Sequence, residues 1–140
     1  MSIRAGKKRQ RGSGMVETAL VLTTFTFMLI GALDFGQFLF VHQALVERAR
    51  KSARWGLVTD PNNTTAIQNM VLYNQSTAPD DGSGYLGLTS SMVQVSHPGT
   101  GTADFRLVVH ITGYRYTLLS PTIGGTYTGP DITIVDPIGQ

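Results

Sequence analysis

Residues 15–41 read MVETALVLTTFTFMLIGALDFGQFLFV, a long apolar stretch that contains two acidic residues, Glu17 and Asp34. No charged residue occurs between positions 18 and 33. At the helical rise of about 1.5 Å per residue, the 27 residues of this stretch cover about 40 Å, which is enough to cross a bilayer. The stretch therefore predicts one membrane-spanning helix.

Positive charges lie on both sides of the apolar stretch. Five precede it (Arg4, Lys7, Lys8, Arg9 and Arg11) and four follow it (Arg48, Arg50, Lys51 and Arg54). The leading group favours an N-terminus in the cytoplasm and a C-terminal part outside. A cleaved secretory signal peptide has the same order of basic and apolar residues. Its apolar region is usually shorter, and no small-x-small cleavage site follows cleanly here, so a retained helix is the preferred interpretation.

The charge is divided unevenly along the chain. The whole sequence has a formal charge of +2 and a pI near 9.2, but residues 59–140 contain two arginines and six aspartates, so 2 − 6 gives −4. This acidic outer part argues against nucleic-acid binding. The absence of cysteine excludes disulfides, thiolate chemistry and cysteine metal sites, and it is compatible with export.

The helix is expected to continue beyond the membrane, because residues 42–56 contain no proline and many helix formers. Gly56 is its predicted end, since Asp60-Pro61 begins a new segment. This outer part of the helix is expected to carry an ion pair of Glu47 with Arg50 or Lys51, and a narrow stripe formed by Leu45, Ala49, Ser52 and Gly56.

The remaining residues predict a small domain, and the fold class is α+β. A short helix is expected within 62–73, capped by Asn63 or Thr64 and with Ile67, Met70 and Val71 on one face. A turn-rich loop is predicted for 74–87, a hairpin for the strands 92–96 and 105–111, and weaker strands for 114–119 and 131–135 with a loop over 121–129. These strands predict one antiparallel sheet against the base of the long helix. This domain has few large apolar side chains, so its core is expected to be small and to need the long helix, or neighbouring subunits, for stability.

No residue pattern favours catalysis or cofactor binding. His42, His97 and His110 are the only histidines, and no two of them have the spacing of metal ligands on one helix. The sequence has no nucleophile elbow and no glycine-rich phosphate loop at a strand-to-helix junction. We therefore expect no enzyme activity, no metal and no cofactor.

The two carboxylates of the apolar stretch are candidate functional residues. A carboxylate in a membrane helix costs several kcal/mol unless a partner compensates it. Asp34 lies 17 residues after Glu17, about 25 Å further along the helix, so the two face different neighbours. Asp34 either extends to the outer interface or lies between helices, where Ala32 and Gly36, spaced i and i+4, let another helix approach closely. Packing between helices is the preferred use of this segment.

Four short sequence motifs follow one another along residues 11–57: Arg11-Gly12, Glu17, the triplet Asp34-Phe35-Gly36, and QALVERARKSAR at 43–54. In this order and spacing they resemble the N-terminal region of TadE-like proteins, the pilin-like subunits of tight-adherence pilus systems. The resemblance covers about a third of the chain. Beyond Thr59 the sequence resembles the family only in a general αβ pattern.

The resemblance implies that a leader, residues 1–12, is removed after Gly12 by an inner-membrane aspartic prepilin peptidase. Ser13 then becomes the first mature residue and Glu17 the fifth, which is the position that pilin-like proteins reserve for glutamate. Family members usually place an aromatic residue next, where this chain has Thr18. A cut after Gly14 would leave Glu17 third, so a cut after Gly12 is preferred.

Processing of this kind supplies a partner for Glu17. It removes the five leading cations, takes the formal charge to 6 − 9, or −3, and leaves an ammonium group on Ser13. In a bundle of subunits, this ammonium group can neutralise Glu17 of a neighbour where the dielectric constant is low. The mature chain would then consist of a membrane and assembly helix over 13–57 and an outer domain over 58–140.

The resemblance thus implies a structural subunit of a tight-adherence-type pilus, inserted once in the inner membrane with a cytoplasmic N-terminus and then carried into an extracellular filament or its tip or base. The implied partners are other pilin-like subunits, the prepilin peptidase, the inner-membrane assembly platform and the lipid bilayer, and nucleic acid is not among them. An outer domain larger than the very short major pilins of these systems favours a minor or initiating subunit over the shaft subunit. The alternative is a bitopic membrane protein that does not polymerise and whose outer domain binds a partner at the cell surface.

Overall fold

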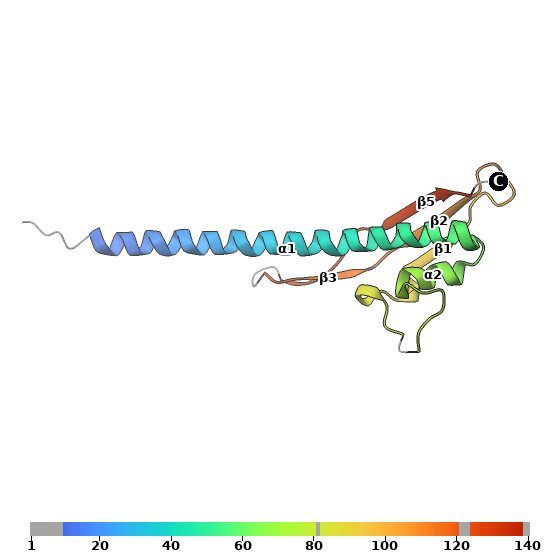
Figure 1. Ribbon diagram of the computed structural model, residues 1–140. Helices are drawn as coiled ribbons and strands as arrows, with labels where there is room; N and C mark the ends of the chain where they lie inside the picture. Colours follow the sequence, from blue (N-terminus) through green and yellow to red (C-terminus); the bar gives the residue numbers. More distant parts are fainter. Residues whose placement is uncertain (1–9, 81, 121–123, 139–140) are drawn as a thin grey trace, which may run out of the picture.

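A computed structural model describes residues 10–80, 82–120 and 124–138. Its main element is a single unbroken helix, α1 (Gln10–Thr59), of 50 residues, whose outer end carries a small domain (Figure 1). Within the described residues, the domain contains the helix α2 (Thr64–Tyr73), two short 3₁₀ turns (Tyr85–Gly87 and Ser90–Met92) and five strands. The predicted α+β class, with a long N-terminal helix, a short helix and antiparallel strands, is confirmed.

The prediction that α1 ends at Gly56 is wrong, because the helix continues to Thr59. Gly56 is buried, and a Cβ atom at this position would lie 2.6 Å from Cδ1 of Ile67 in α2. That distance is shorter than van der Waals contact. The glycine therefore lets α2 pack closely against α1, and it does not end the helix.

α2 lies where the sequence predicted a short helix. The side chain of Asn63 accepts a hydrogen bond from the backbone N–H of Ala66 at 3.0 Å, so Asn63 is the N-cap. Asn74 ends the helix in the left-handed conformation, and its N–H donates to the carbonyl of Met70. The predicted apolar face, which includes Ile67, is buried.

The strands form two antiparallel sheets rather than the single sheet that was predicted. The first has the order β1 (Val93–Ser96), β2 (Arg106–Ile111) and β5 (Ile132–Pro137), and it includes the predicted hairpin of β1 and β2. The second is a hairpin of β3 (Arg115–Leu118) and β4 (Gly125–Thr128). β4 lies within the stretch predicted as a loop, where Thr126, Tyr127 and Thr128 favour a strand in spite of the neighbouring glycines.

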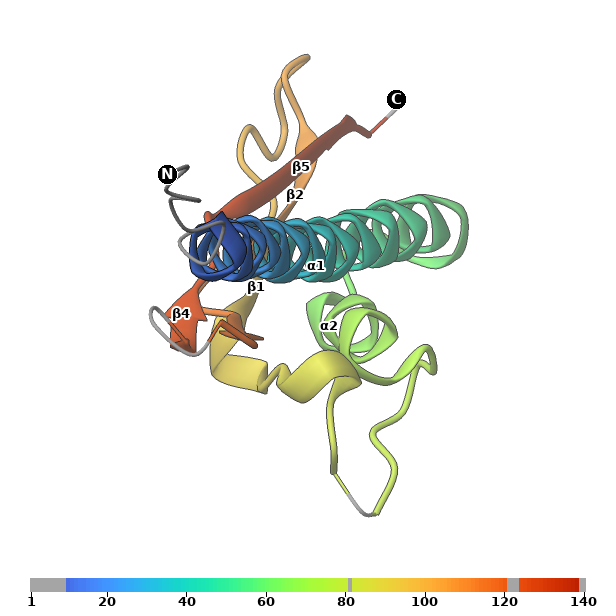
Figure 2. The same ribbon diagram turned by 90° about the vertical axis from the view of Figure 1, so that its left-hand side faces the viewer.

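The core lies between the outer half of α1, α2 and the three-stranded sheet. Viewed almost along α1, the strands β2 and β5 pass on one side of the helix and α2 lies on the other (Figure 2). The predicted stripe of Leu45, Ala49, Ser52 and Gly56 is buried in this core. From the other elements the core takes Ile67, Val71, Leu107, Val109, Ile111, Tyr114 and Ile132.

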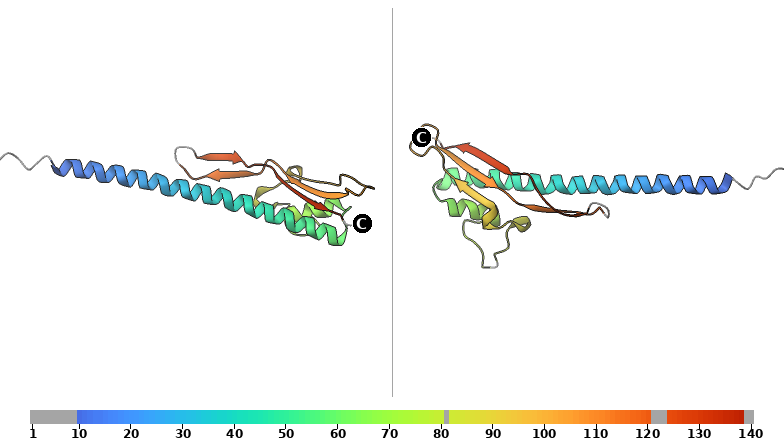
Figure 3. Two further views of the ribbon diagram at one scale, coloured as in Figure 1. Left: turned by 90° about the horizontal axis from the view of Figure 1, so that it is seen from above. Right: turned by 180° about the vertical axis from the view of Figure 1, so that it is seen from behind.

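The N-terminal half of α1 projects away from this core. The hairpin of β3 and β4 leaves the domain and runs beside α1 towards that half, as two further views show (Figure 3). This hairpin brings Leu119 and Ser120 to Asp34, near the middle of the long helix. The position of the hairpin beside α1 therefore determines what surrounds Asp34.

Candidate assembly helix and its buried carboxylate

The first part of α1 is exposed and apolar. Every described side chain from residue 12 to residue 29 is exposed, and among them are large apolar ones such as Met15, Leu20 and Phe25. Within the described residues, α1 is the one helix that is long and apolar enough to cross a membrane. Such a surface is stable when lipid or other helices cover it.

The hydroxyl groups in this part of α1 are satisfied inside the helix. Thr18, Thr23, Thr24 and Thr26 each donate a hydrogen bond to the backbone carbonyl four residues earlier, at 2.8–2.9 Å. In hydrocarbon no water replaces a missing hydrogen bond. These internal bonds therefore make the four threonines compatible with a lipid environment.

The residues predicted for processing lie at the start of α1. Gly12 and Ser13 occur in its first turn, and a Cβ atom at Gly12 would contact nothing within 4 Å. Glu17 is exposed, and its carboxylate has no hydrogen bond or ion pair within the described part of the chain. Residues 1–9 of the predicted leader lie outside the described residues.

Asp34 has partners that the sequence analysis did not identify. The residue is only 5% exposed. Its Oδ1 accepts a hydrogen bond from the backbone N–H of Leu119 at 2.6 Å, and its Oδ2 accepts one from the N–H of Ser120 at 3.0 Å. The carboxylate is covered, and the two donors belong to the same chain and not to another helix. Two hydrogen bonds to the carboxylate compensate its loss of water.

Ala32 and Gly36 lie on a different face of α1. Each is two residues from Asp34, and at 100° per residue this places both about 200° from it. Both are exposed, and a Cβ atom at Gly36 would contact nothing within 4 Å. The structure thus separates the predicted assembly residues, with Asp34 under the hairpin and Ala32 and Gly36 on an open face.

Two aromatic contacts continue the attachment of the hairpin along α1. The ring of Phe38 lies 4.9 Å from the ring of Tyr116, between centroids, and Nδ1 of His42 lies 2.7 Å from the hydroxyl oxygen of Tyr114. Tyr114 is buried, and this burial, followed by the nearby Tyr116, raises the pKa of its hydroxyl above the usual 10.0. Asp34, Phe38 and His42 therefore hold the hairpin at three successive levels.

The sequence contained a signal for this attachment. Asp34, Phe38 and His42 are spaced by four residues, and the same face continues into the buried stripe that begins at Leu45. Only the outer part of this face, from Leu45 onward, was predicted, because a carboxylate within an apolar stretch indicates a membrane residue. The position of the donors was not predictable from spacing, since Leu119 is 85 residues away.

Comparison with known families adds one finding. The model of the family described as TadE-like protein matches residues 12–54. This segment is TadE-like. The match covers slightly less than a third of the chain, contains Glu17 and Asp34, and ends before α2. Comparisons with curated proteins and with solved structures find no match.

The TadE-like segment includes both the exposed part of α1 and much of the part that packs in the core. The family is a structural, pilus-related family and not a family of enzymes. Together with the apolar helix, the match supports a pilus-associated, pilin-like membrane protein that is anchored by a single helix, α1.

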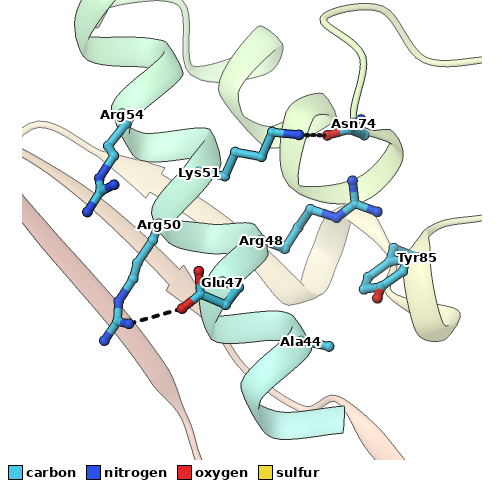
Figure 4. Close-up of a pocket in the computed structure, with 8 residues that line it drawn as sticks. All are labelled: Ala44, Glu47, Arg48, Arg50, Lys51, Arg54, Asn74 and Tyr85. Carbon is cyan, nitrogen blue, oxygen red and sulfur yellow. Dashed lines mark hydrogen bonds and ion pairs between the residues drawn. The ribbon is translucent and has the colours of Figure 1, made fainter. Parts of the chain in front are cut away.

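The outer end of the TadE-like segment carries a basic groove, shown in Figure 4 and formed by Arg48, Arg50, Lys51 and Arg54 with neighbouring residues. Arg50 pairs with Glu47 at 3.3 Å, which confirms one of the two predicted pairings. Lys51 instead donates to the side-chain oxygen of Asn74 at 3.0 Å, and Arg48 lies over the ring of Tyr85. The contacts of Lys51 and Arg48 connect α1 to the end of α2 and to the loop that follows it, so two of the four cations have a role in packing.

Proposed function

We propose that this protein is a pilin-like structural subunit of a tight-adherence-type pilus, made as a precursor in the inner membrane and assembled through α1. The observation that carries the proposal is the exposed apolar half of α1, which is TadE-like, contains an unpartnered Glu17 and extends from a folded domain. In the membrane, lipid covers this half. In a filament, the corresponding halves of neighbouring subunits cover it.

Processing after Gly12 by a prepilin peptidase is the second part of the proposal. The cut leaves Ser13 with a free ammonium group, four residues from Glu17, or about 6 Å along the helix axis. A neighbouring subunit displaced by this distance brings its ammonium group level with Glu17. In a low-dielectric bundle the pair determines the axial register more than it adds net stability.

Close packing of helices occurs on the face of Ala32 and Gly36. Small side chains allow helix backbones to approach and gain van der Waals contact without relying on the hydrophobic effect. Asp34 does not take part directly, because its own hairpin covers it. The assembly platform of the inner membrane then receives processed subunits, and the size of the outer domain favours a minor or initiating subunit.

The decisive experiment measures incorporation of the Glu17→Ala variant into sheared filaments, in cells that carry the pilus system. We expect normal membrane insertion and cleavage, but a large loss from the filament fraction. Val21→Ala, on the same exposed helix, is the matched control and should assemble normally. Normal incorporation of E17A would contradict the pairing of Glu17 with Ser13.

Intact-mass measurement of the membrane-embedded protein tests processing separately. The expected mass is that of a chain beginning at Ser13. A product that retains Met1 would overturn the proposed cleavage and favour the alternative of a bitopic protein that does not polymerise.

A further inference from the structure

The position of Asp34 along α1 relates the hairpin of β3 and β4 to the membrane. Counted from Ser13, about 20 helical residues cover the hydrocarbon thickness of about 30 Å, so the hydrocarbon ends near Leu33. Asp34 is then the first residue in the polar layer. This position follows from a span that begins at Ser13, shortly after the basic Arg11, and it is the same for either orientation of the protein.

The hydrogen bonds of Asp34 bring the end of β3 to the same level. The backbone N–H groups of Leu119 and Ser120 lie 2.6 Å and 3.0 Å from the carboxylate oxygens. The hairpin runs beside α1 from the domain towards the exposed half of the helix (Figure 3). Leu119 is therefore held where the hydrocarbon ends, although it is far from α1 in sequence.

The side chains at this level form a surface that is continuous with the apolar span. Leu119 is 67% exposed even though its backbone is fixed, and Leu33 and Phe35 of α1 are 63% and 62% exposed. Further from the span, the rings of Tyr116 and Tyr127 are stacked at 6.1 Å, and Tyr127 is exposed. Exposed apolar side chains followed by tyrosines are typical of the boundary between acyl chains and headgroups.

We propose that the hairpin of β3 and β4 is a second membrane contact, in which Leu119 lies in the bilayer surface beside α1. Asp34 is the positioning residue for this contact, because it holds the Leu119 backbone against the helix. Two attachments, the helix and the hairpin, restrict the tilt of the outer domain relative to the bilayer. This second contact requires that α1 spans the membrane from about Ser13, not that the protein polymerises.

The absence of cysteine from the sequence allows a clean test by single-site labelling. The full chain carrying Leu119→Cys is labelled with an environment-sensitive fluorophore and placed in phosphatidylethanolamine and phosphatidylglycerol vesicles at low protein density. Quenching is measured with a lipid spin-labelled near the headgroup and with aqueous iodide. Val58→Cys, an 88% exposed site near the outer end of α1, and Phe25→Cys, within the span, are the matched controls.

We expect the label at position 119 to be quenched several-fold more strongly by the lipid probe than the label at position 58, and to be protected from iodide. Adding Asp34→Ala to the Leu119→Cys chain should remove this lipid quenching, while the label at position 25 remains in lipid. Circular dichroism confirms that α1 is intact in each variant.

Three other results would overturn the inference, and they are distinguishable. If position 119 behaves like position 58 while position 25 is quenched by lipid, α1 spans the membrane but the hairpin does not contact it. If position 119 becomes protected only at high protein density and without lipid quenching, the surface is covered by another subunit and not by lipid. Failure of lipid quenching at position 25 itself would show that α1 does not span the membrane.

Discussion

Asp34 shows how one polar residue connects distant parts of this chain. A buried carboxylate requires hydrogen-bond donors, and the structure supplies two backbone N–H groups from the end of β3. The sequence indicated the requirement, because a charge in an apolar stretch is costly. It did not indicate the donors, because backbone N–H groups carry no side-chain signature.

Replacing Asp34 with alanine is expected to destabilise the hairpin. The two N–H groups lose their acceptor, and leaving such groups unsatisfied costs about 1–3 kcal/mol each when they stay buried. Hydrogen exchange of the amides of Leu119 and Ser120, measured in detergent micelles, should accelerate strongly. Asp104→Ala is the control, because its ion pair with Arg106 is exposed and should contribute less than about 1 kcal/mol. Unchanged protection of both amides in D34A would contradict the role of Asp34.

The raised pKa of Tyr114 predicts that the free energy of unfolding decreases at alkaline pH. Burial raises the pKa of its hydroxyl in the folded state above 10.0, the value expected when the chain is unfolded. The folded state therefore holds the proton more tightly, so this contribution to stability is complete below about pH 10 and is lost as the pH rises through the folded-state pKa.

The variant Tyr114→Phe tests this prediction. Its free energy of unfolding should fall less steeply above pH 10, as measured by urea denaturation across a pH series. Near neutral pH it should be lower by about 1 kcal/mol, because the hydrogen bond to His42 is lost. Tyr127→Phe, at an exposed site, should keep the alkaline decrease. An equally steep decrease in Y114F would assign the alkaline transition to another group.

At the scale of elements, α1 and α2 were predictable and the hairpin of β3 and β4 was not. The length and apolar character of residues 15–41 predict α1, and a polar cap followed by apolar residues at helical spacing predicts α2. The attachment of the second sheet to α1 depends on contacts between residues that are distant in the sequence. β4 in particular has every residue exposed, so it lacks the alternation that identifies a half-buried strand.

Two glycines of α1 give opposite predictions for the same substitution. At Gly36 a Cβ atom meets nothing within 4 Å, so Gly36→Ala should stabilise the isolated subunit by up to about 1 kcal/mol through helix propensity. At Gly56 the new atom would lie 2.6 and 2.7 Å from two side-chain carbons of the buried Ile67. Overpacking costs about 1–3 kcal/mol and exceeds the gain in propensity.

Urea denaturation of the Gly36→Ala and Gly56→Ala variants in detergent compares the gain in helix propensity with the cost of overpacking. Gly56→Ala should lower the midpoint and Gly36→Ala should raise it or leave it unchanged. Equal shifts for the two variants would show that close contact between α1 and α2 does not determine the residue at position 56. A loss of filament incorporation by G36A, in spite of its stability, would support the proposed helix-packing face.

At the scale of the whole molecule, α1 has an exposed apolar N-terminal half and an outer half that packs in the core. This difference predicts which part of the chain folds by itself. Every buried apolar residue of the described core lies at Leu45 or beyond, and the hairpin contacts described above begin at Asp34. A chain of residues 34–140 therefore keeps the core and the hairpin contacts of Asp34, Phe38 and His42. It lacks the exposed apolar span and should be soluble and folded.

A shorter chain of residues 43–140 is the matched comparison. It keeps Leu45 and the core stripe but loses Asp34, Phe38 and His42, which contact the hairpin. Because an isolated two-stranded hairpin is marginally stable at best, the amides of β3 and β4 should exchange rapidly while those of β2 stay protected. NMR hydrogen exchange of both chains distinguishes the outcomes. Protection of β3 in the shorter chain would mean that the domain supports the hairpin without α1, and the helix would then serve only for anchoring and assembly.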